Sequence, residues 1–173
     1  MKVFCQDESR FGLLPVQRRR ITVRGVKPVG PVPYQFENFY VSGAVEPITG
    51  ESFFLELPQL NGANFQSFPN AFAHSYSDTL NLVLMDNGRC YTAKSLVIPA
   101  NVVWLFLPPY SPELNPMERL WQDIKAQLAG MIVAQIDALE HELETLIRQY
   151  SMAAVRALTS YPYFVRAVNA VCS

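Results

Sequence analysis

Residues 107–121 read LPPYSPELNPMERLW, a proline-rich segment that leads directly into the start of a helix. Asn115, Pro116 and Glu118 have the pattern of a helix N-terminus, in which Asn115 is the N-cap, Pro116 is the first helical residue and Glu118 bonds back to the cap. The helix continues as one apolar stripe, formed by Met117, Leu120, Trp121, Ile124 and Leu128. Glu118 falls at the edge of that stripe, and the prolines fix where the helix begins. Its carboxylate therefore has two interpretations, as a capping group or as a functional acid held near the end of a sheet.

Outward from this segment, strand-like and helix-like stretches follow one another. Apolar and β-branched runs predict a strand at the N-terminus, a hairpin with its turn at EPITGE, and two buried strands at NLVLMD (81–86) and VVWLFL (102–107). Helical spacing is present at 62–77, despite Pro69, and again in a long helix at 132–150 and a last stretch at about 151–171. TAKSLVIPA is expected to be a short helix or turn. This order predicts an α/β domain with a mixed central sheet flanked by helices.

Two further acids follow or interrupt predicted strands. Asp86 ends the strand NLVLMD, where it forms either an ordinary Asx turn before Gly88 or part of a site at the carboxyl end of the sheet. Asp7 lies in VFCQDESRF. Either that strand ends at Gln6 and leaves Asp7 in solvent, or Asp7 shares one face with Val3 and Cys5 while Phe4, Gln6 and Glu8 take the other.

Three carboxylates that converge at one sheet would repel one another unless cations lay between them. Hard divalent ions with oxygen ligands fit this set, because the Cys and His residues are too dispersed to form a soft-metal site. Two Mg²⁺ ions held in this way would activate a nucleophile and stabilise the leaving oxygen of a phosphodiester. Asp7, Asp86 and Glu118 are thus the candidate catalytic and metal-binding residues, and nuclease or strand-transfer chemistry is the expected activity.

The composition is that of one globular domain. The 173 residues are 50% hydrophobic and 17% charged, with a net charge of −1, so a basic DNA-binding patch would have to be local. Three widely separated cysteines without a CxxC pair argue against a disulfide framework or a structural zinc site, and fit a reducing cytoplasm. No apolar run is long enough to span a membrane.

DESRFGL, the strand ending in MDNG, and LPPYSPELNPMERLW together resemble the IS630/Tc1/mariner superfamily of DDE transposases, and GVKPVG with YVSGAVEPITGE resembles its IS630 group. The resemblance implies an RNase H-like fold and a metal-binding triad of Asp7, Asp86 and Glu118. It further implies two Mg²⁺ ions, for which Mn²⁺ substitutes, and cleavage and strand transfer at the ends of an insertion sequence. The implied partners are transposon-end and target DNA and a second copy in a homodimer, and the implied location is the cytoplasm, associated with the nucleoid.

The sequence departs from the family pattern in three ways. Only 31 residues separate Asp86 from Glu118, a few fewer than is usual, and the histidine that often follows the DN pair is replaced in GRCYT. Residues 1–173 are expected to form a single catalytic domain, with a helical C-terminal stretch from about 132. The N-terminal helix-turn-helix domains of relatives are expected to be missing from these 173 residues and to be supplied by a separate DNA-binding domain or subunit.

The basic residues have a structural and a functional interpretation. Five basic residues lie within ten positions: Arg18, Arg19, Arg20, Arg24 and Lys27. They belong either to a solvated hairpin, whose charges keep an edge strand from pairing, or to a flap that contacts DNA phosphates. Lys125, two turns after Glu118, is a further candidate phosphate contact, although an ordinary surface lysine is the simpler interpretation. Phe65, Phe68, Phe72 and Tyr76 are expected in the core rather than as a base-stacking platform, and His74 and His141 are expected to be incidental. Two alternative functions stay open: a non-catalytic subunit that holds DNA ends or supports assembly, and an RNase H-like nuclease with another substrate.

Overall fold

The computed structural model describes residues 1–13, 37–88, 96–129, 131 and 133–172. Over these residues the chain forms strands β1 (Lys2–Gly12), β2 (Asn38–Val45) and β3 (Ser52–Leu57), helices α1 (Gly62–Phe65) and α2 (Ser67–Ser75), and strands β4 (Asn81–Met85) and β5 (Val102–Phe106). A short 3₁₀ helix η1 (Pro112–Leu114) then precedes four helices: α3 (Met117–Leu128), α4 (Ile136–Gln149), α5 (Met152–Thr159) and α6 (Pro162–Cys172).

The strands form one mixed sheet in the order β3-β2-β1-β4-β5. Strand β1 pairs antiparallel with β2 and parallel with β4, and β5 pairs parallel with β4 at the edge of the sheet. The pairing of β1 with β2 continues from Cys5 to Gly12, with Asp7 opposite Gly43. The interpretation in which the first strand ends at Gln6 is therefore wrong, because β2 supplies backbone partners well beyond that point.

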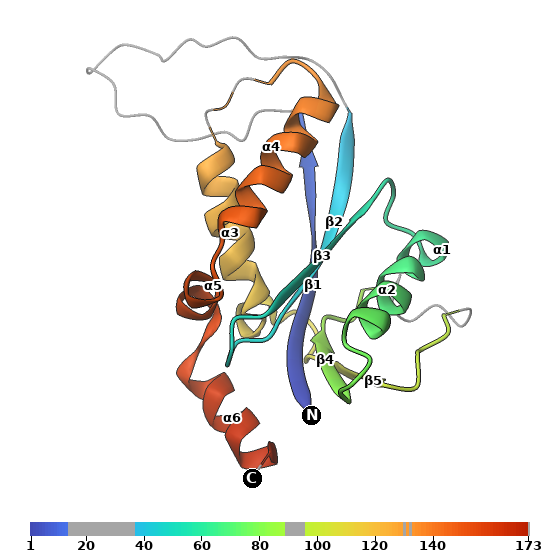
Figure 1. Cartoon of the computed structure of the whole chain (residues 1–173), viewed down its shortest axis with the longest axis vertical. Helices are drawn as coiled ribbons and strands as arrows, with labels where there is room; N and C mark the ends of the chain where they lie inside the picture. The colour runs from blue at the N-terminus through green and yellow to red at the C-terminus, as the bar shows by residue number, and fades with distance from the viewer. Residues whose placement is uncertain (14–36, 89–95, 130, 132, 173) are drawn as a thin grey trace.

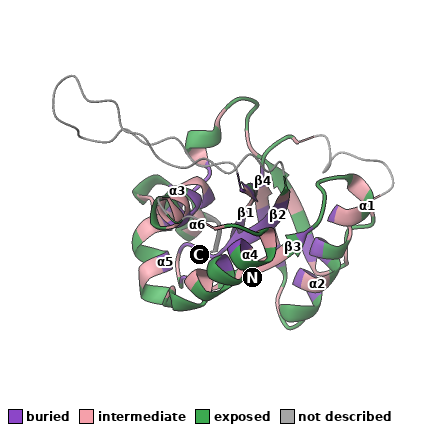
Figure 2. Cartoon of the chain, turned by 90° about the horizontal axis from the view of Figure 1, so that it is seen from above, coloured by how far each residue is buried: buried purple, intermediate pink, exposed green. Residues whose placement is uncertain are grey.

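Helices cover both faces of the sheet (Figure 1). Helices α3 to α6 lie on one side and α1 and α2 on the other, and the view from above in Figure 2 shows the buried residues concentrated between these layers. Strand β1 is central and contributes to both interiors, since Val3 and Cys5 belong to the core under α3 and Phe4 belongs to the core under α2. This alternation confirms the predicted division of β1 into two faces.

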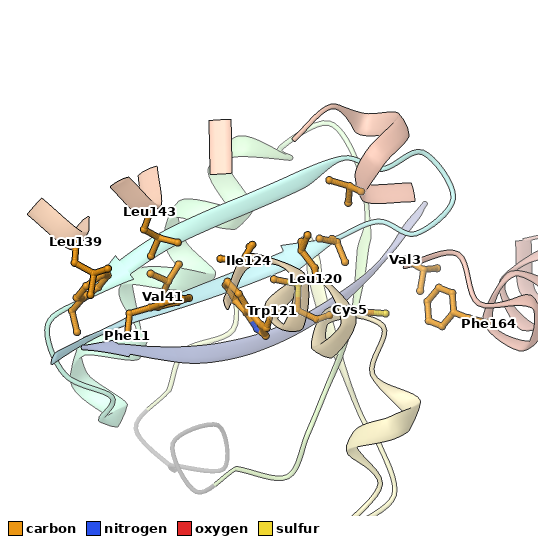
Figure 3. Close-up of a cluster of buried hydrophobic side chains, with 14 of the residues drawn as sticks. Val3, Cys5, Phe11, Val41, Leu120, Trp121, Ile124, Leu139, Leu143 and Phe164 are labelled. Atoms are coloured by element: carbon orange, nitrogen blue, oxygen red, sulfur yellow. The ribbon is translucent and has the colours of Figure 1, made fainter. Parts of the chain in front are cut away.

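The core under α3 is built from the predicted apolar stripe (Figure 3). Leu120, Trp121 and Ile124 are buried against the sheet, where they meet residues of β1 and β2 such as Phe11 and Val41. Helix α4 closes this layer with Leu139 and Leu143, the buried residues of its predicted apolar face. The helix that carries Glu118 is thus fixed on the sheet by a stripe of buried side chains that includes Met117, Leu120, Trp121 and Ile124.

The opposite core consists largely of stacked aromatic rings. Phe72 meets Phe4 edge to face with ring centroids 4.9 Å apart, and Phe65 and Phe68 continue the same row. The prediction that these aromatics form core rather than a base-stacking platform is confirmed. The expected helix over 62–77 is divided at Gln66, and Pro69 falls in the first turn of α2, where a missing N–H removes no helical hydrogen bond.

One expectation needs correction. The strand 102–107 was expected to be buried, but Val103, Leu105 and Phe106 are 42%, 44% and 44% exposed, because β5 is the edge strand and α3 packs over β1 and β2 instead. The stretch 151–171 is helical as predicted, and it is divided into α5 and α6 because Pro162 begins α6 and disfavours a helical conformation in the residue before it. Of TAKSLVIPA, residues 92–95 lie outside the described residues, and 96–99 have no regular structure. None of the described helices is long and apolar enough to cross a bilayer.

Candidate active site

The three predicted acids lie on the central strands and the helix beside them. Asp7 is half-buried in the middle of β1, Asp86 follows the last residue of β4, and Glu118 is the second residue of α3. Cys5 of β1 lies opposite Leu84 of β4 in the parallel ladder, so two residues further along each strand Asp7 and Asp86 reach the same level. Alternation from Cys5 and Leu84, which both contribute to the core under α3, directs both acids to the side of the sheet that carries Glu118.

Electrostatics show that these acids act on one another. Burial, together with the negative charges of Glu118 and Asp86, raises the pKa of Asp7 from 3.8 to about 7, against the opposing effects of the Glu8 backbone N–H and of Lys125. Among the described residues, however, no three Asp, Glu, His or Cys side chains are placed so that they could hold one metal ion. The acids are therefore close enough for their charges to interact, but their carboxylates are not arranged as the ligands of one metal ion.

Asp86 forms the predicted Asx turn. Its Oδ1 accepts a hydrogen bond of 2.9 Å from the backbone N–H of Gly88, and the neighbouring Asn87 donates from its side chain to the carbonyl of Leu107 at 2.6 Å. The turn is thereby tied to the end of β5. Because the Asp86 side chain is exposed, its second carboxylate oxygen stays accessible at the carboxyl end of the sheet.

The start of α3 differs from the predicted capping box. The helix begins at Met117, and the backbone N–H of Asn115 donates to the carbonyl of Pro112 at 2.9 Å rather than to Glu118. The N-cap position is Pro116 rather than Asn115, and Asn115 supports the helix start from one residue earlier, since its Oδ1 accepts the N–H of Met117 at 3.1 Å. The capping interpretation of the Glu118 carboxylate is therefore wrong in its predicted form.

Of the candidate DNA contacts, the structure places Lys125. Its Nζ lies 5.7 Å from the centroid of the Phe11 ring, and its charge lowers the pKa of Asp7. Lys125 is therefore a half-buried neighbour of the acids, and its contact with phosphate stays a prediction. Arg18, Arg19, Arg20, Arg24 and Lys27 lie outside the described residues.

A cluster of polar side chains that the sequence patterns did not predict lies on the opposite face of β1. Gln6 donates from Nε2 to Glu8 at 2.8 Å and to the hydroxyl of Ser42 at 3.0 Å, and that hydroxyl donates to Glu8 at 3.3 Å. Burial raises the pKa of Glu8 from 4.5 to about 8. Alternation along β1 places Gln6 and Glu8 together, but Ser42 joins them only through the register of β2, which the sequence does not specify.

Residues 2–140 match the family described as DDE superfamily endonuclease. The chain belongs to this family. Among sequence relatives, this chain is 37% identical over 84 residues to the Sinorhizobium fredii protein y4pE/y4sA, a match that covers 48% of this chain and 62% of the relative. It is also 33% identical over 51 residues to the Tc1 transposase of Caenorhabditis elegans, over 30% of this chain and 19% of that transposase.

Solved structures of the Mos1 transposase share the fold. The pre-cleavage Mos1 transpososome superposes with a TM-score of 0.73 at 15% identity, over 91% of this chain and 52% of the Mos1 chain. The Mos1 paired-end complex with Mn gives a TM-score of 0.67 at 17% identity, over 91% and 51%. The predicted RNase H-like fold and the resemblance to Tc1/mariner transposases are confirmed, whereas the narrower IS630 assignment stays a prediction. The chain spans about half the length of the Mos1 chains, and 62% and 19% of the two sequence relatives.

The raised pKa values of Asp7 and Glu8 predict that the stability of the folded chain falls as pH rises. The pKa values of Asp7 and Glu8 are higher in the folded chain than their ordinary values of 3.8 and 4.5, so both side chains hold their protons more tightly when the chain is folded. The stabilisation is complete below about pH 4 and is lost as pH passes through about 7 and 8, so the free energy of unfolding declines across this window. Urea unfolding in metal-free buffer between about pH 5 and 8.5 measures this decline in the free energy of unfolding. In Glu8→Gln the decline should be visibly shallower; an unchanged slope would mean that Glu8 does not titrate in this window.

Proposed function

We propose that this chain is the catalytic domain of an IS630-like Tc1/mariner transposase, which cleaves DNA at the ends of an insertion sequence and transfers the freed strand to target DNA. The observation that carries the proposal is the placement of Asp7 and Asp86 on neighbouring parallel strands, on the face of the sheet that α3 covers, where the charges of Glu118 and Asp86 add to burial in raising the pKa of Asp7. In this role the three acids are the catalytic residues, held by two neighbouring parallel strands and the first turn of α3.

The donor set fits hard divalent cations. Three carboxylates offer only oxygen ligands, which suit Mg²⁺ and Mn²⁺, and their mutual repulsion favours a cation between them. Asp7, Asp86 and Glu118 would hold two Mg²⁺ ions, with Mn²⁺ as a substitute. The bound ions would supply Lewis-acid activation of the nucleophile and charge neutralisation at the leaving oxygen. The exposed Asp86 side chain can rotate out of its Asx turn, and binding would displace the proton that Asp7 retains near pH 7. Mos1 complexes have been crystallised with Mn and with Mg, which supports this choice of ions.

The same proposal specifies partners. DNA would lie across the acids, with Lys125 beside Asp7 contacting a phosphate and the basic residues from Arg18 to Lys27 providing further contacts. Mos1 has been solved in paired-end complexes with its transposon end, which supports a homodimer acting on transposon ends and target DNA. Sequence-specific binding would come from a separate DNA-binding domain or subunit, and the protein would act in the cytoplasm on nucleoid DNA.

Mn²⁺-dependent nicking of supercoiled plasmid DNA tests the proposal, with an RNA–DNA hybrid as the comparison substrate. We expect Mn²⁺ binding by the purified chain, nicking of the plasmid, loss of nicking in EDTA, and recovery when excess Mn²⁺ or Mg²⁺ is restored. Hydrolysis of the hybrid without nicking of the plasmid would contradict the transposase proposal and would indicate an RNase H-like nuclease with another substrate.

A non-catalytic subunit that holds DNA ends is the second candidate. It is favoured by the use of the Asp86 carboxylate in the turn with Gly88 and by the open arrangement of acids among the described residues. In that case the chain would bind DNA without binding Mn²⁺ and would not nick it, and the wild type and Asp86→Asn would behave alike in both respects.

A further inference from the structure

The two residues that precede Asp7 and Glu118 are joined by one buried side chain. Asn115 is 4% exposed, and its Nδ2 donates to the backbone carbonyl of Gln6 at 2.8 Å while its Oδ1 accepts the N–H of Met117 at 3.1 Å. Gln6 immediately precedes Asp7 in β1, and Met117 immediately precedes Glu118 in α3. A single amide group therefore bridges the main chains next to two of the three acids, across 109 residues of sequence.

Packing fixes the same junction from the sheet side. Gly43 lies opposite Asp7 in the β1–β2 ladder, and a Cβ at Gly43 would come within 2.4 Å of Met117 Cε and 3.0 Å of the Phe54 ring. The absence of a side chain at Gly43 thus makes the space that the fully buried Met117 occupies. The first turn of α3 is seated on the strand position directly beside Asp7.

The segment before Asn115 has a second, outer restraint. The hydroxyl of Tyr163 in α6 donates to the carbonyl of Leu114 at 2.8 Å, and the Tyr163 side chain is exposed. This bond holds the same segment against α6 and makes no link to β1. It therefore serves as a matched control for the bond between Asn115 and Gln6.

We propose that Asn115 is a positioning residue that sets the separation of Asp7 and Glu118, and so the affinity of the site for its divalent ions. The inference rests on the proposed function. Asparagine suits this place because its amide both donates and accepts. Serine at position 115 would keep a capping oxygen for the Met117 N–H but is too short to supply the donor to Gln6, and aspartate would turn a carboxylate oxygen toward the Gln6 carbonyl.

The test compares Asn115→Ser with Tyr163→Phe in the full 173-residue chain, by two measurements. The first needs no metal: in methyl NMR, the Met117 methyl should show a strong NOE to the Gly43 α-protons in the wild type and in Tyr163→Phe, and a weakened or split signal in Asn115→Ser. The second is Mn²⁺ affinity, followed by the EPR signal of free Mn²⁺. We expect affinity about tenfold weaker in Asn115→Ser, by analogy with residues that orient metal ligands, and unchanged in Tyr163→Phe.

The two measurements separate the possible failures. An unchanged Met117–Gly43 NOE in Asn115→Ser would overturn the positioning role, whether or not the chain binds metal. An altered NOE with Mn²⁺ affinity within about twofold of the wild type would also overturn it, because the helix would have moved without consequence for the site. If the wild type binds no Mn²⁺, the proposed function fails, and the link from Asn115 to ion affinity fails with it.

Discussion

Replacing any one acid of the triad by its amide is expected to reduce Mn²⁺-dependent DNA cleavage by at least about 10³-fold, the upper end of the loss seen when one charge-stabilising group is removed from an active site. Asp7→Asn, Asp86→Asn and Glu118→Gln each preserve side-chain shape but remove a negative oxygen that a divalent ion requires. The effect should lie in the rate of the chemical step rather than in DNA affinity, since phosphate contacts are made by basic residues. Single-turnover cleavage at saturating protein gives the rate directly.

The control for these variants is Glu113→Gln, which removes an exposed carboxylate from η1, five residues before Glu118. It should cleave at close to the wild-type rate. Stability gives a second, independent check: near pH 8 Asp7→Asn should unfold at a higher urea concentration than the wild type, because it removes a half-buried charge that Glu118 and Asp86 repel. Wild-type cleavage by all three amide variants would show that the acids do not perform the chemistry.

Much of this arrangement could be predicted from local sequence patterns. The period-2 alternation of β1 correctly placed Asp7 on the face of Val3 and Cys5, and the 3.6-residue period of α3 placed Glu118 at the edge of its buried stripe. Both patterns are properties of a single element, which is why the sequence alone reveals them.

Other features depend on contacts between distant segments. The strand β1 continues past Gln6 because β2 pairs with it, and no local signal reports a partner strand. Likewise, the pattern Asn115-Pro116-Met117-Glu118 predicts a cap from neighbouring residues, whereas the bond that decides the role of Asn115 reaches Gln6. The apolar run of β5 indicates burial, yet its place at the edge of the sheet leaves half of it exposed. Such features follow from topology rather than from propensity.

Trp121→Ala is expected to have the largest effect on stability, a loss of about 3–5 kcal/mol in the free energy of unfolding. The side chain is 2% exposed and lies between Phe11 and Phe54, with ring centroids 5.9 and 5.8 Å away, at the centre of the core under α3 (Figure 3). Its removal leaves a cavity beneath the helix that carries Glu118, three residues earlier. Urea unfolding followed by circular dichroism measures the loss.

Trp121→Phe separates packing from hydrogen bonding at this position. Among the described residues the Trp121 Nε1 atom is buried without a hydrogen-bond partner, a situation that costs about 1–3 kcal/mol in folded proteins. Phenylalanine loses part of the ring volume but also removes that unpaired N–H, so the two effects oppose each other and the net loss should be less than half that of Trp121→Ala. The Trp121→Phe protein should therefore keep α3 seated on the sheet and retain Mn²⁺-dependent cleavage. A loss in Trp121→Phe as large as in Trp121→Ala would mean that Nε1 is hydrogen-bonded in solution, and that α3 is held by a polar contact as well as by its apolar stripe.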